Sequence, residues 1–220
     1  MGTILVTGAN RGIGLELCRQ LVVSGEQVIA VCRRRSKELD AVGVSVATGI
    51  DVSSDKDVKD LARRLKGVRL DTVINNAGIL ESVQLEALDM KSMRNQFEIN
   101  ALGPLRITQA LLPNLRSSAK VAIITSRMGS IADNTSGGSY GYRMSKAAVN
   151  MAGKSLSLDL HPKGIAVALI HPGYVKTDMT GFSGMIEASE AAAGILDRIR
   201  ELDLNNTGTF WHMNGETLPW

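Results

Sequence analysis

The stretch VTGANRGIG (residues 6–14) follows a short β-branched run, TILVT (3–7), and leads into a segment of helical period that begins at Ile13. Its glycines stand at positions 8, 12 and 14. Glycine allows unusual φ angles and close approach to another group, and a helix N-terminus adds free N–H donors and partial positive charge. The spacing is GxxxGxG and not GxGxxG. We therefore interpret the turn as a dinucleotide-binding turn only together with the elements that surround it.

Outward from this turn, apolar β runs alternate with segments of helical period. The β runs lie at 3–7, 27–31, 44–48, 71–75, 119–126, 164–172 and 208–213, and the helical segments begin at 13 and lie near 55–66, 90–112, 142–160 and 186–202. Strands this uniformly apolar are expected where both faces of a sheet are covered. The pattern predicts an α/β fold over residues 1–220: a single-domain, Rossmann-type, doubly wound parallel sheet of about seven strands with helices on both faces.

The composition narrows the class of protein. The chain has 220 residues, 44% of them hydrophobic and 21% charged, with a net charge of +3, which is typical of one globular domain with a mildly basic surface. The sequence shows no basic face rich in aromatic residues, so it does not predict nucleic-acid binding. No apolar run approaches the length of a membrane span. Cys18 and Cys32 lie in apolar patterns, and the three histidines are widely spaced. We expect a cytoplasmic protein without disulfides and without a metal site.

The second β run ends in AVCRRR (30–35), which bears on the choice of cofactor. A site that prefers NAD would place an acidic residue there to accept hydrogen bonds from the ribose, but Cys32 stands at that position and Arg33 follows it. Arg11, in the glycine turn, can lie close by. Two guanidinium groups suit a 2′-phosphate, so the sequence predicts NADP, with NADPH preferred over NADH. A solvated cluster of charges remains the alternative.

Polar residues also end the third and fourth runs. Asp51 follows the third, and the sequence NNAG (75–78) follows the fourth. Ligands of open α/β sheets bind outside the carboxyl ends of strands, so both are expected to line an adenosine crevice. Either could equally be a turn-forming residue.

The stretch GSYGYRMSK (138–146) contains two tyrosines and a lysine. Tyr142 and Lys146 share a helix face, whereas Tyr140 pairs only with Met144. An ammonium about 4 Å from a phenol, at an effective dielectric constant of about 20, is worth roughly 4 kcal/mol and would lower the phenol pKa by about three units. We therefore expect Tyr142 to act as a general acid and base near neutral pH, although such a pair alone can be merely structural.

Five motifs in order, TGANRGIG, NNAG, ITS, YRMSK and HPGYVKTDM, give the chain a resemblance to the short-chain dehydrogenase/reductase family. The resemblance covers essentially the whole chain. Within the family, the sequence is most similar to the carbonyl-reductase-like group that includes C-factor signalling proteins and sniffer-type carbonyl reductases. It implies an oxidoreductase, a carbonyl reductase, that transfers hydride between NADP(H) and a small carbonyl or alcohol substrate.

The resemblance also implies roles for individual residues. Tyr142 would exchange a proton with the substrate oxygen, Lys146 would lower the pKa of Tyr142 and bind the nicotinamide ribose, Ser126 would hydrogen-bond the substrate carbonyl, and Asn100 would hold the lysine through a water. Val175 and Thr177 would contact the carboxamide. Together with the residues above, the expected cofactor-binding set is Gly8, Asn10, Arg11, Gly12, Ile13, Gly14, Arg33, Asp51, Val52, Asn75, Asn76, Ala77, Gly78, Tyr142, Lys146, Pro172, Gly173, Val175 and Thr177.

One departure from the family pattern concerns the serine. Ser126 precedes Tyr142 by 16 positions, which is longer than is usual in the family and indicates a small insertion rich in Gly and Ser. Such a segment can loop out. Ser130 and Ser139 remain alternatives for the serine role.

The resemblance leaves partner and function partly open. The segment DMTGFSGM (178–185) is a short flap, which suggests an open pocket and loose specificity. Helices like those expected at 90–112 and 142–160 often pair across a twofold axis in the family, so we expect a homodimer or homotetramer. A dinucleotide-binding signalling or regulatory protein with little turnover is the second hypothesis. The set of Asn100, Ser126, Tyr142 and Lys146 favours an enzyme.

Overall fold

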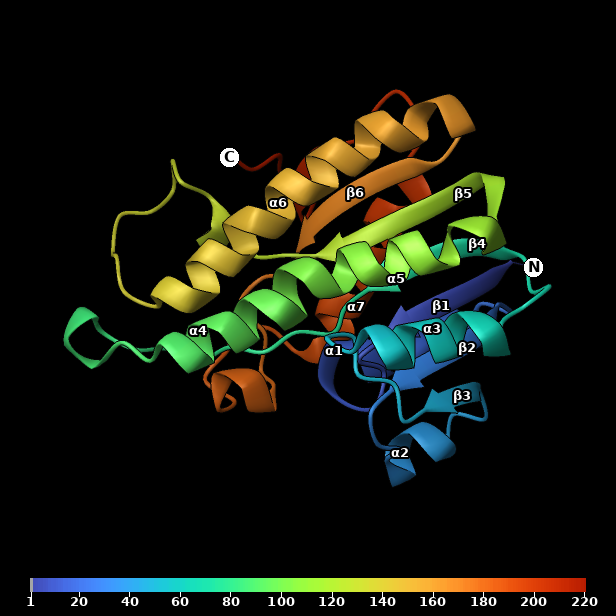
Figure 1. The fold of residues 1–220 in the computed structure, drawn as a ribbon, viewed down its shortest axis with the longest axis horizontal. Helices are drawn as coiled ribbons and strands as arrows, with labels where there is room; N and C mark the ends of the chain where they lie inside the picture. Colours follow the sequence, from blue (N-terminus) through green and yellow to red (C-terminus); the bar gives the residue numbers. More distant parts are fainter. Residues whose placement is uncertain (1) are drawn as a thin grey trace.

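A parallel sheet forms the centre of the computed structural model, which describes residues 2–220 (Figure 1). Its strands are β1 Thr3–Thr7, β2 Gln27–Cys32, β3 Ser45–Thr48, β4 Leu70–Asn75, β5 Leu115–Ile124, β6 Ala166–His171 and β7 Thr209–His212. They lie in the order β3-β2-β1-β4-β5-β6-β7, and every neighbouring pair is parallel. The predicted fold class is therefore confirmed.

Helices cover both faces of this sheet. The helices are α1 Gly12–Val23, α2 Lys37–Asp40, α3 Asp55–Arg64, α4 Met90–Phe97, α5 Gly103–Leu111, α6 Tyr140–Leu160 and α7 Ala188–Glu201. In Figure 1, α3 to α6 lie in front of the sheet and α1 and α7 lie behind it. Each face has its own hydrophobic core. The core behind the sheet contains Val6 and Ala122 together with residues of α1 and α7. The core in front of the sheet contains Leu5 and Val121 together with residues of α3 and α5. Since alternate residues of each strand are buried on opposite faces, the strands are apolar throughout.

The order of the strands decides where a ligand can bind. From β1 the sheet continues through β2 and β3 on one side and through β4 to β7 on the other. The reversal between β1 and β4 opens a crevice outside their carboxyl ends. The glycine turn follows β1, and the NNAG segment follows β4, so both enter this crevice from adjacent strands.

The helix expected at 90–112 consists of three parts. A π-helical turn, Glu98–Leu102, separates α4 from α5, and the Gly103 N–H donates to the carbonyl of Glu98, five residues back. Pro104 follows and has no N–H, so it cannot donate to the carbonyl of Asn100. In Figure 1 the three parts run on as one rod. The irregular turn places Asn100 in the middle of the rod, and π-turns inside α-helices are frequent at functional sites.

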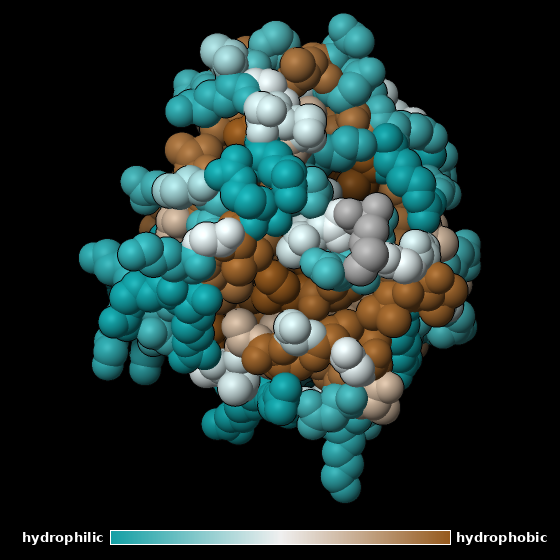
Figure 2. All heavy atoms as spheres, turned by 90° about the vertical axis from the view of Figure 1, so that its right-hand side faces the viewer, coloured by the Kyte–Doolittle hydropathy of each residue, from teal (hydrophilic) through white to brown (hydrophobic). Residues whose placement is uncertain are grey.

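The opposite edge of the sheet, where the strands begin, has a different character. Figure 2 looks onto this edge and shows apolar side chains exposed among polar ones. A hollow of about 700 Å³ there is lined in part by Val22, Val28, Val44 and Val68. Across residues 2–220, no helix is both long and apolar enough to cross a bilayer.

Candidate active site

A cleft of about 710 Å³ lies at the carboxyl ends of β1, β2 and β4. Most of the residues expected to bind a cofactor line it: Gly8, Asn10, Arg11, Gly12, Ile13, Gly14, Arg33, Asp51, Val52, Asn76, Ala77, Gly78 and Thr177. Pro172, Gly173 and Val175 follow β6 at the same edge of the sheet but do not line this cleft, and neither do Tyr142 and Lys146. The wall also contains residues that sequence reasoning missed, among them Arg34, Ile50, Ile79, Ile99, Asp178 and Met179.

The glycine turn is shaped by close backbone approach. Gly8 has φ of 66°, and a Cβ there would lie 2.8 Å from the Cα of Ala77. Gly12 has φ of 53°, and its missing Cβ would lie 3.3 Å from Cγ2 of Thr177, across the cleft. Side chains at these positions would be strained and would narrow the passage between the turn and the flap. The turn therefore leaves the backbone and the start of α1 open to a pyrophosphate.

The two asparagines after β4 have different neighbours. Asn76 donates from Nδ2 to the carbonyl oxygens of Thr7 and Gly8, at 3.0 and 3.2 Å, so it braces the glycine turn. Asn75 is buried and donates to Oγ1 of Thr108 in α5, at 3.3 Å. The expectation that Asn75 binds the cofactor needs correction: its side chain is bonded to α5 and does not line the cleft.

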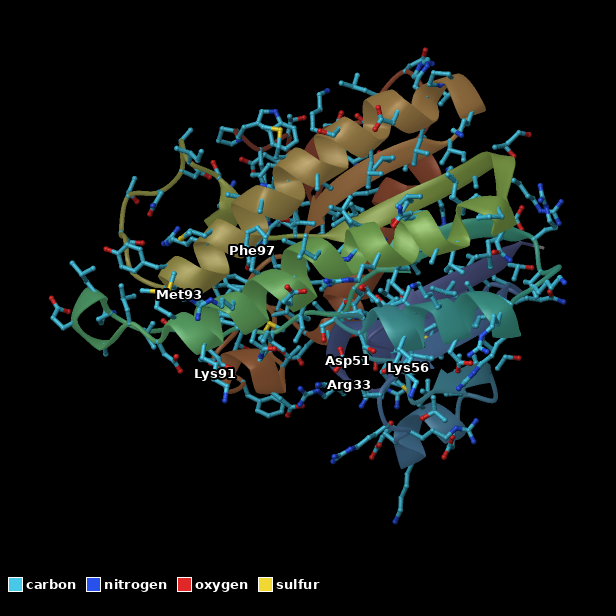
Figure 3. All side chains as sticks on the ribbon, in the orientation of Figure 1. Arg33, Asp51, Lys56, Lys91, Met93 and Phe97 are labelled. Atoms are coloured by element: carbon cyan, nitrogen blue, oxygen red, sulfur yellow. The ribbon has the colours of Figure 1, made fainter. Side chains whose placement is uncertain are left out.

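The adenosine end of the cleft is charged. Nη1 of Arg33 lies 3.7 Å from Oδ2 of Asp51, and Figure 3 shows the two side chains together, with Lys56 of α3 in the same part of the view. Burial alone would raise the pKa of the Asp51 carboxyl, but hydrogen bonds from Ser53 and the nearby Arg33 lower it below its usual value. Arg34 adds a second guanidinium to the wall. The run of three arginines at 33–35 indicated a basic wall at this end of the cleft, but the sequence alone did not show which of the three line it.

Arg11 lines the cleft, and its side chain is paired with the flap. Its Nη1 donates to Oδ2 of Asp178 in the flap, at 3.0 Å, and both side chains are at least half exposed. The pair joins the glycine turn to the segment after β6. Thr177 directly precedes the flap, and the carbonyl of Val175 accepts a hydrogen bond from Oγ1 of Thr180 at 2.7 Å. The flap is thus held by its own short-range bonds and by Arg11.

Tyr142 and Lys146 lie on the same face of α6 and are both buried, with 8% and 5% of their surface exposed. Nζ of Lys146 lies 5.7 Å from the centroid of the Tyr142 ring and donates to the carbonyl of Ile124 at 2.9 Å. Burial raises the pKa of Tyr142 to about 12 and lowers the pKa of Lys146 to about 8. The expected lowering of the phenol pKa is therefore wrong for this structure, because burial outweighs an ammonium that is bonded elsewhere.

Ser126 meets Tyr142 in spite of the longer spacing between them. The hydroxyl of Ser126, which accepts a hydrogen bond from the Met128 N–H at 3.1 Å, lies near enough to the Tyr142 phenol to lower its pKa, though by less than burial raises it. The extra residues loop out, since 131–137 are all exposed. The two alternative serines are engaged elsewhere: Oγ of Ser130 accepts from the Asp133 N–H at 3.1 Å, and Oγ of Ser139 lies 2.7 Å from Oγ of Ser82.

Asn100 supports the site from the π-turn. Its amide donates to the carbonyl of Ile79 at 2.9 Å and to Oγ of Ser145 at 3.0 Å, and its Oδ1 accepts from the Ile79 N–H at 2.9 Å. These bonds fix the chain just after NNAG to the centre of α6. Asn100 thus joins the cleft to the helix that carries Tyr142 and Lys146.

His171, at the end of β6, was not singled out by the sequence. Its ring makes an edge contact with His212, with the ring centroids 5.0 Å apart, and its Nδ1 has no hydrogen-bond partner. Burial, with the charges of His212, Arg127 and Lys146 adding to it, lowers the pKa of His171 to about 3. The sequence around His171 does not predict this burial, because His212, Arg127 and Lys146 come from distant parts of the chain.

Comparison with known sequences agrees with this geometry. The family described as short chain dehydrogenase matches residues 2–186. The chain is 46% identical to 1-hydroxy-2-glutathionyl-2-methyl-3-butene dehydrogenase of Rhodococcus sp., over 100% of both proteins. It is 48% identical to C-signal of Myxococcus xanthus over 69% of this chain and 93% of that protein.

Solved structures give the same result. The carbonyl reductase Sniffer of D. melanogaster superposes with a TM-score of 0.93 at 31% identity, covering 100% of both chains. An NADPH-bound carbonyl reductase from chicken fatty liver superposes with a TM-score of 0.91 at 30% identity, covering 100% of this chain and 99% of the other. The cleft residues fit a nicotinamide dinucleotide, and the protein is an oxidoreductase. The chain belongs to the short-chain dehydrogenase family.

Proposed function

We propose that the protein is an NADPH-dependent reductase of aldehydes or ketones, with Ser126, Tyr142 and Lys146 as its catalytic residues. One observation carries the proposal: the buried phenol of Tyr142 has Ser126 beside it and the buried Lys146 on the same helix face, with Nζ 5.7 Å from the centroid of its ring. This group lies at the carboxyl edge of the sheet, as does the dinucleotide cleft. A phenol held in this way has a task beyond packing.

The protonation states suit the proton transfer that accompanies reduction of a carbonyl. With a pKa of about 12, Tyr142 is protonated at neutral pH and is ready to donate to an oxygen that gains charge. NADPH, when bound, supplies the hydride. The Ser126 hydroxyl would hold the carbonyl oxygen, and the Lys146 ammonium, with a pKa of about 8, keeps most of its charge at neutral pH. Asn100 would keep the floor of the site in place through Ile79 and Ser145.

The preference for NADPH over NADH rests on the arginines beside the adenosine end of the cleft. Arg33 and Arg34 line it, and no acidic residue stands at the end of β2 to receive the ribose of NADH. Arg33 is free to turn toward a phosphate, because its side chain is 63% exposed and its Nη1 lies 3.7 Å from Asp51. Guanidinium groups bind phosphate through paired, charge-assisted hydrogen bonds.

The relatives suggest which substrates to test first. The Rhodococcus protein is named for an alcohol that carries a glutathionyl thioether. We therefore include such an alcohol and its aldehyde beside simple carbonyls. The likeness to C-signal keeps the regulatory alternative, a dinucleotide-binding protein with little turnover, as an outcome of the same test.

Absorbance of the reduced nicotinamide, followed with a panel of aldehydes, ketones and alcohols, tests the proposal. Tyr142→Phe should lower kcat by about 10²–10⁴-fold, because the general acid is lost. Tyr140→Phe is the matched control on the same helix and should change kcat by less than about 2-fold, since it lacks the lysine partner. Both variants should bind NADPH like the wild type. Tight NADPH binding without turnover by any of the three proteins would favour the regulator.

The proposal extends to assembly and location. Met144, Met151 and Leu158 stand seven residues apart on α6 and are 54%, 69% and 65% exposed. This apolar stripe faces away from β6 and suits a second copy of the chain, as in the family's paired helices, so we propose a homodimer. Free, buried cysteines suit a reducing compartment such as the cytoplasm.

A further inference from the structure

We propose that Arg127 and Arg143 are positioning residues that hold the turn after Ser126 and the loop 131–137 against α6, and so set the position of the Ser126 hydroxyl relative to Tyr142. Each arginine directly follows one of these two residues in the chain. The inference rests on the function proposed above, and it concerns the insertion that separates this chain from the usual spacing of the family.

Arg143 reaches back from the first turns of α6 to three points of the segment before it. Its Nε donates to the carbonyl of Gly137 at 3.1 Å, and its Nη2 donates to Oγ of Ser136 at 2.8 Å. Its Nη1 lies 3.5 Å from the carbonyl of Met128, in the turn that begins at Ser126. One guanidinium therefore spans both ends of the exposed loop.

Arg127 holds the same segment from the other side. Its Nε lies 3.1 Å from Oδ2 of Asp133 in the loop, and its Nη2 donates to Oε1 of Glu216 at 3.0 Å. The C-terminal segment is tied to the loop a second time, because the Ala132 N–H donates to the carbonyl of Trp220 at 3.0 Å. In Figure 1 the loop between β5 and α6 lies beside the C-terminal end of the chain. Arg127 thus joins Ser126, the loop and the C-terminal segment.

The turn itself leaves little freedom once it is docked. A Cβ on Gly129 would lie 2.6 Å from the carbonyl carbon of Lys146, so the turn Arg127–Gly129 lies directly on the backbone of α6. Any lift of this turn moves Ser126 away from Tyr142. The residues at 131–137 are exposed and bury no apolar side chain that could prevent such a lift. Beside the backbone bond from Ala132 to Trp220, the two arginines supply the contacts that hold the loop in place.

A double-mutant cycle between Arg143 and Ser126 tests the proposal. Arg143→Met should lower kcat by about 10- to 100-fold, since a shift of about 1 Å in a reacting group has that effect. The Kd for NADPH, read from its fluorescence, should stay unchanged. In the Ser126→Ala background the same substitution should lower kcat by less than about 2-fold further, because residues that act as a unit are not additive. Arg143→Lys should recover part of the loss.

Arg127 and a control complete the set. The double variant Asp133→Asn/Glu216→Gln removes both partners of Arg127 and leaves the arginine in place. Like Arg143→Met, it should lower kcat in the wild-type background. In the Ser126→Ala background it should lower kcat by less than about 2-fold further. Arg116→Met is the control: Arg116 lies at the other end of β5, pairs with Asp71 at 3.0 Å, and should not affect kcat.

Two results would overturn the inference while leaving the proposed function intact. One is an equal loss of kcat from Arg143→Met with and without Ser126, and the other is a loss in Arg116→Met as large as in Arg143→Met. Absence of turnover in the wild type, with NADPH bound, would instead overturn the proposed function and the positioning role with it. A variant that unfolds is recognised by its lost NADPH binding. In that case the kcat of Arg143→Lys and of the double variant Asp133→Asn/Glu216→Gln decides whether the arginines position Ser126.

Discussion

At the scale of single residues, burial acts in opposite directions on the two ionisable groups of α6. It raises the pKa of Tyr142 to about 12 and lowers the pKa of Lys146 to about 8, because each group loses hydration of its charged form. The phenol is kept as an acid, whereas the amine is brought close to the pH at which it exchanges its proton. Tyr142 therefore keeps its proton at neutral pH, and Lys146 keeps most of its positive charge.

The proposed preference for NADPH can be tested at Arg33, one of the two arginines that line the cleft at its adenosine end. Arg33→Ala should raise the Kd for NADPH by about 10- to 100-fold, because hydrogen bonds to a charged phosphate contribute about 1.5–3 kcal/mol. The Kd for NADH should change much less. Arg35→Ala is the matched control from the same run of three, since Arg35 pairs with Asp40 and does not line the cleft. Fluorescence titration with both nucleotides measures the result, and equal losses for NADPH and NADH would mean that Arg33 does not hold the 2′-phosphate.

His171 should make the fold sensitive to acid. Burial is the main cause that lowers its pKa to about 3, so the unfolded chain, with a histidine pKa of about 6.5, binds a proton that the folded chain refuses. Stability from this residue is present above pH 6.5 and is lost as the pH falls toward 3. Between pH 7 and pH 4 the wild type should lose about 3 kcal/mol more of its free energy of unfolding than His171→Gln. Urea unfolding at pH 7, 5 and 4 gives both slopes, and identical slopes would contradict the assignment.

At the scale of the elements, two glycines let neighbouring segments approach α6. Gly129 lets the Ser126 turn lie on Lys146, and Gly153 lets the helix pack on Leu169 of β6, where a Cβ would lie 2.6 Å from Cδ2 of that leucine. The first contact lies at the site and the second lies away from it. The same kind of overpacking should therefore have different effects at the two positions.

Gly129→Ala should lower kcat by about 10-fold or more, because the added methyl group meets the backbone of Lys146 and lifts Ser126 away from Tyr142. Gly153→Ala should cost about 1–3 kcal/mol of unfolding free energy and leave kcat per folded molecule unchanged. Thermal or urea unfolding and initial rates on both variants separate the two effects. If Gly129→Ala lost only stability, the distance between Ser126 and Tyr142 would not depend on this contact.

Local pattern predicted some elements well and could not predict others. The apolar strands and the glycine turn depend on neighbours in sequence, so periodicity and turn chemistry sufficed. The π-turn around Asn100 lies inside a continuous helical pattern, and the inward direction of Asn75 depends on Thr108, 33 residues away. The pKa of Tyr142 depends on burial that only the packed chain creates. The pairing of Arg11 with Asp178 likewise joins segments 167 residues apart.

At the scale of the whole molecule, chemistry and assembly use different surfaces. The cleft and the Ser126–Tyr142 contact lie at the carboxyl edge of the sheet, where strand order reverses between β1 and β4. The apolar stripe Met144, Met151 and Leu158 runs along the outer face of α6. In Figure 3, Met93 and Phe97 lie on the side of α4 that faces α6, and Lys91 lies on the other side. Phe97 is 38% exposed.

The stripe predicts the oligomeric state. A stable interface buries about 1,200–2,000 Å² in total, and a charge placed at its centre, with no partner, costs several kcal/mol. Met151→Glu with Leu158→Glu should therefore turn a wild-type dimer into a monomer, as measured by light scattering on a sizing column. Val23→Glu is the control, because Val23 is 89% exposed on α1, on the opposite face of the sheet. The monomer should keep its kcat per chain, since no described residue of the site lies on the stripe.

Two outcomes would contradict this interface: a wild type with the mass of one chain, or a dimer that survives both charges. A wild-type tetramer that falls to dimers would mean that α6 forms only one of its two interfaces.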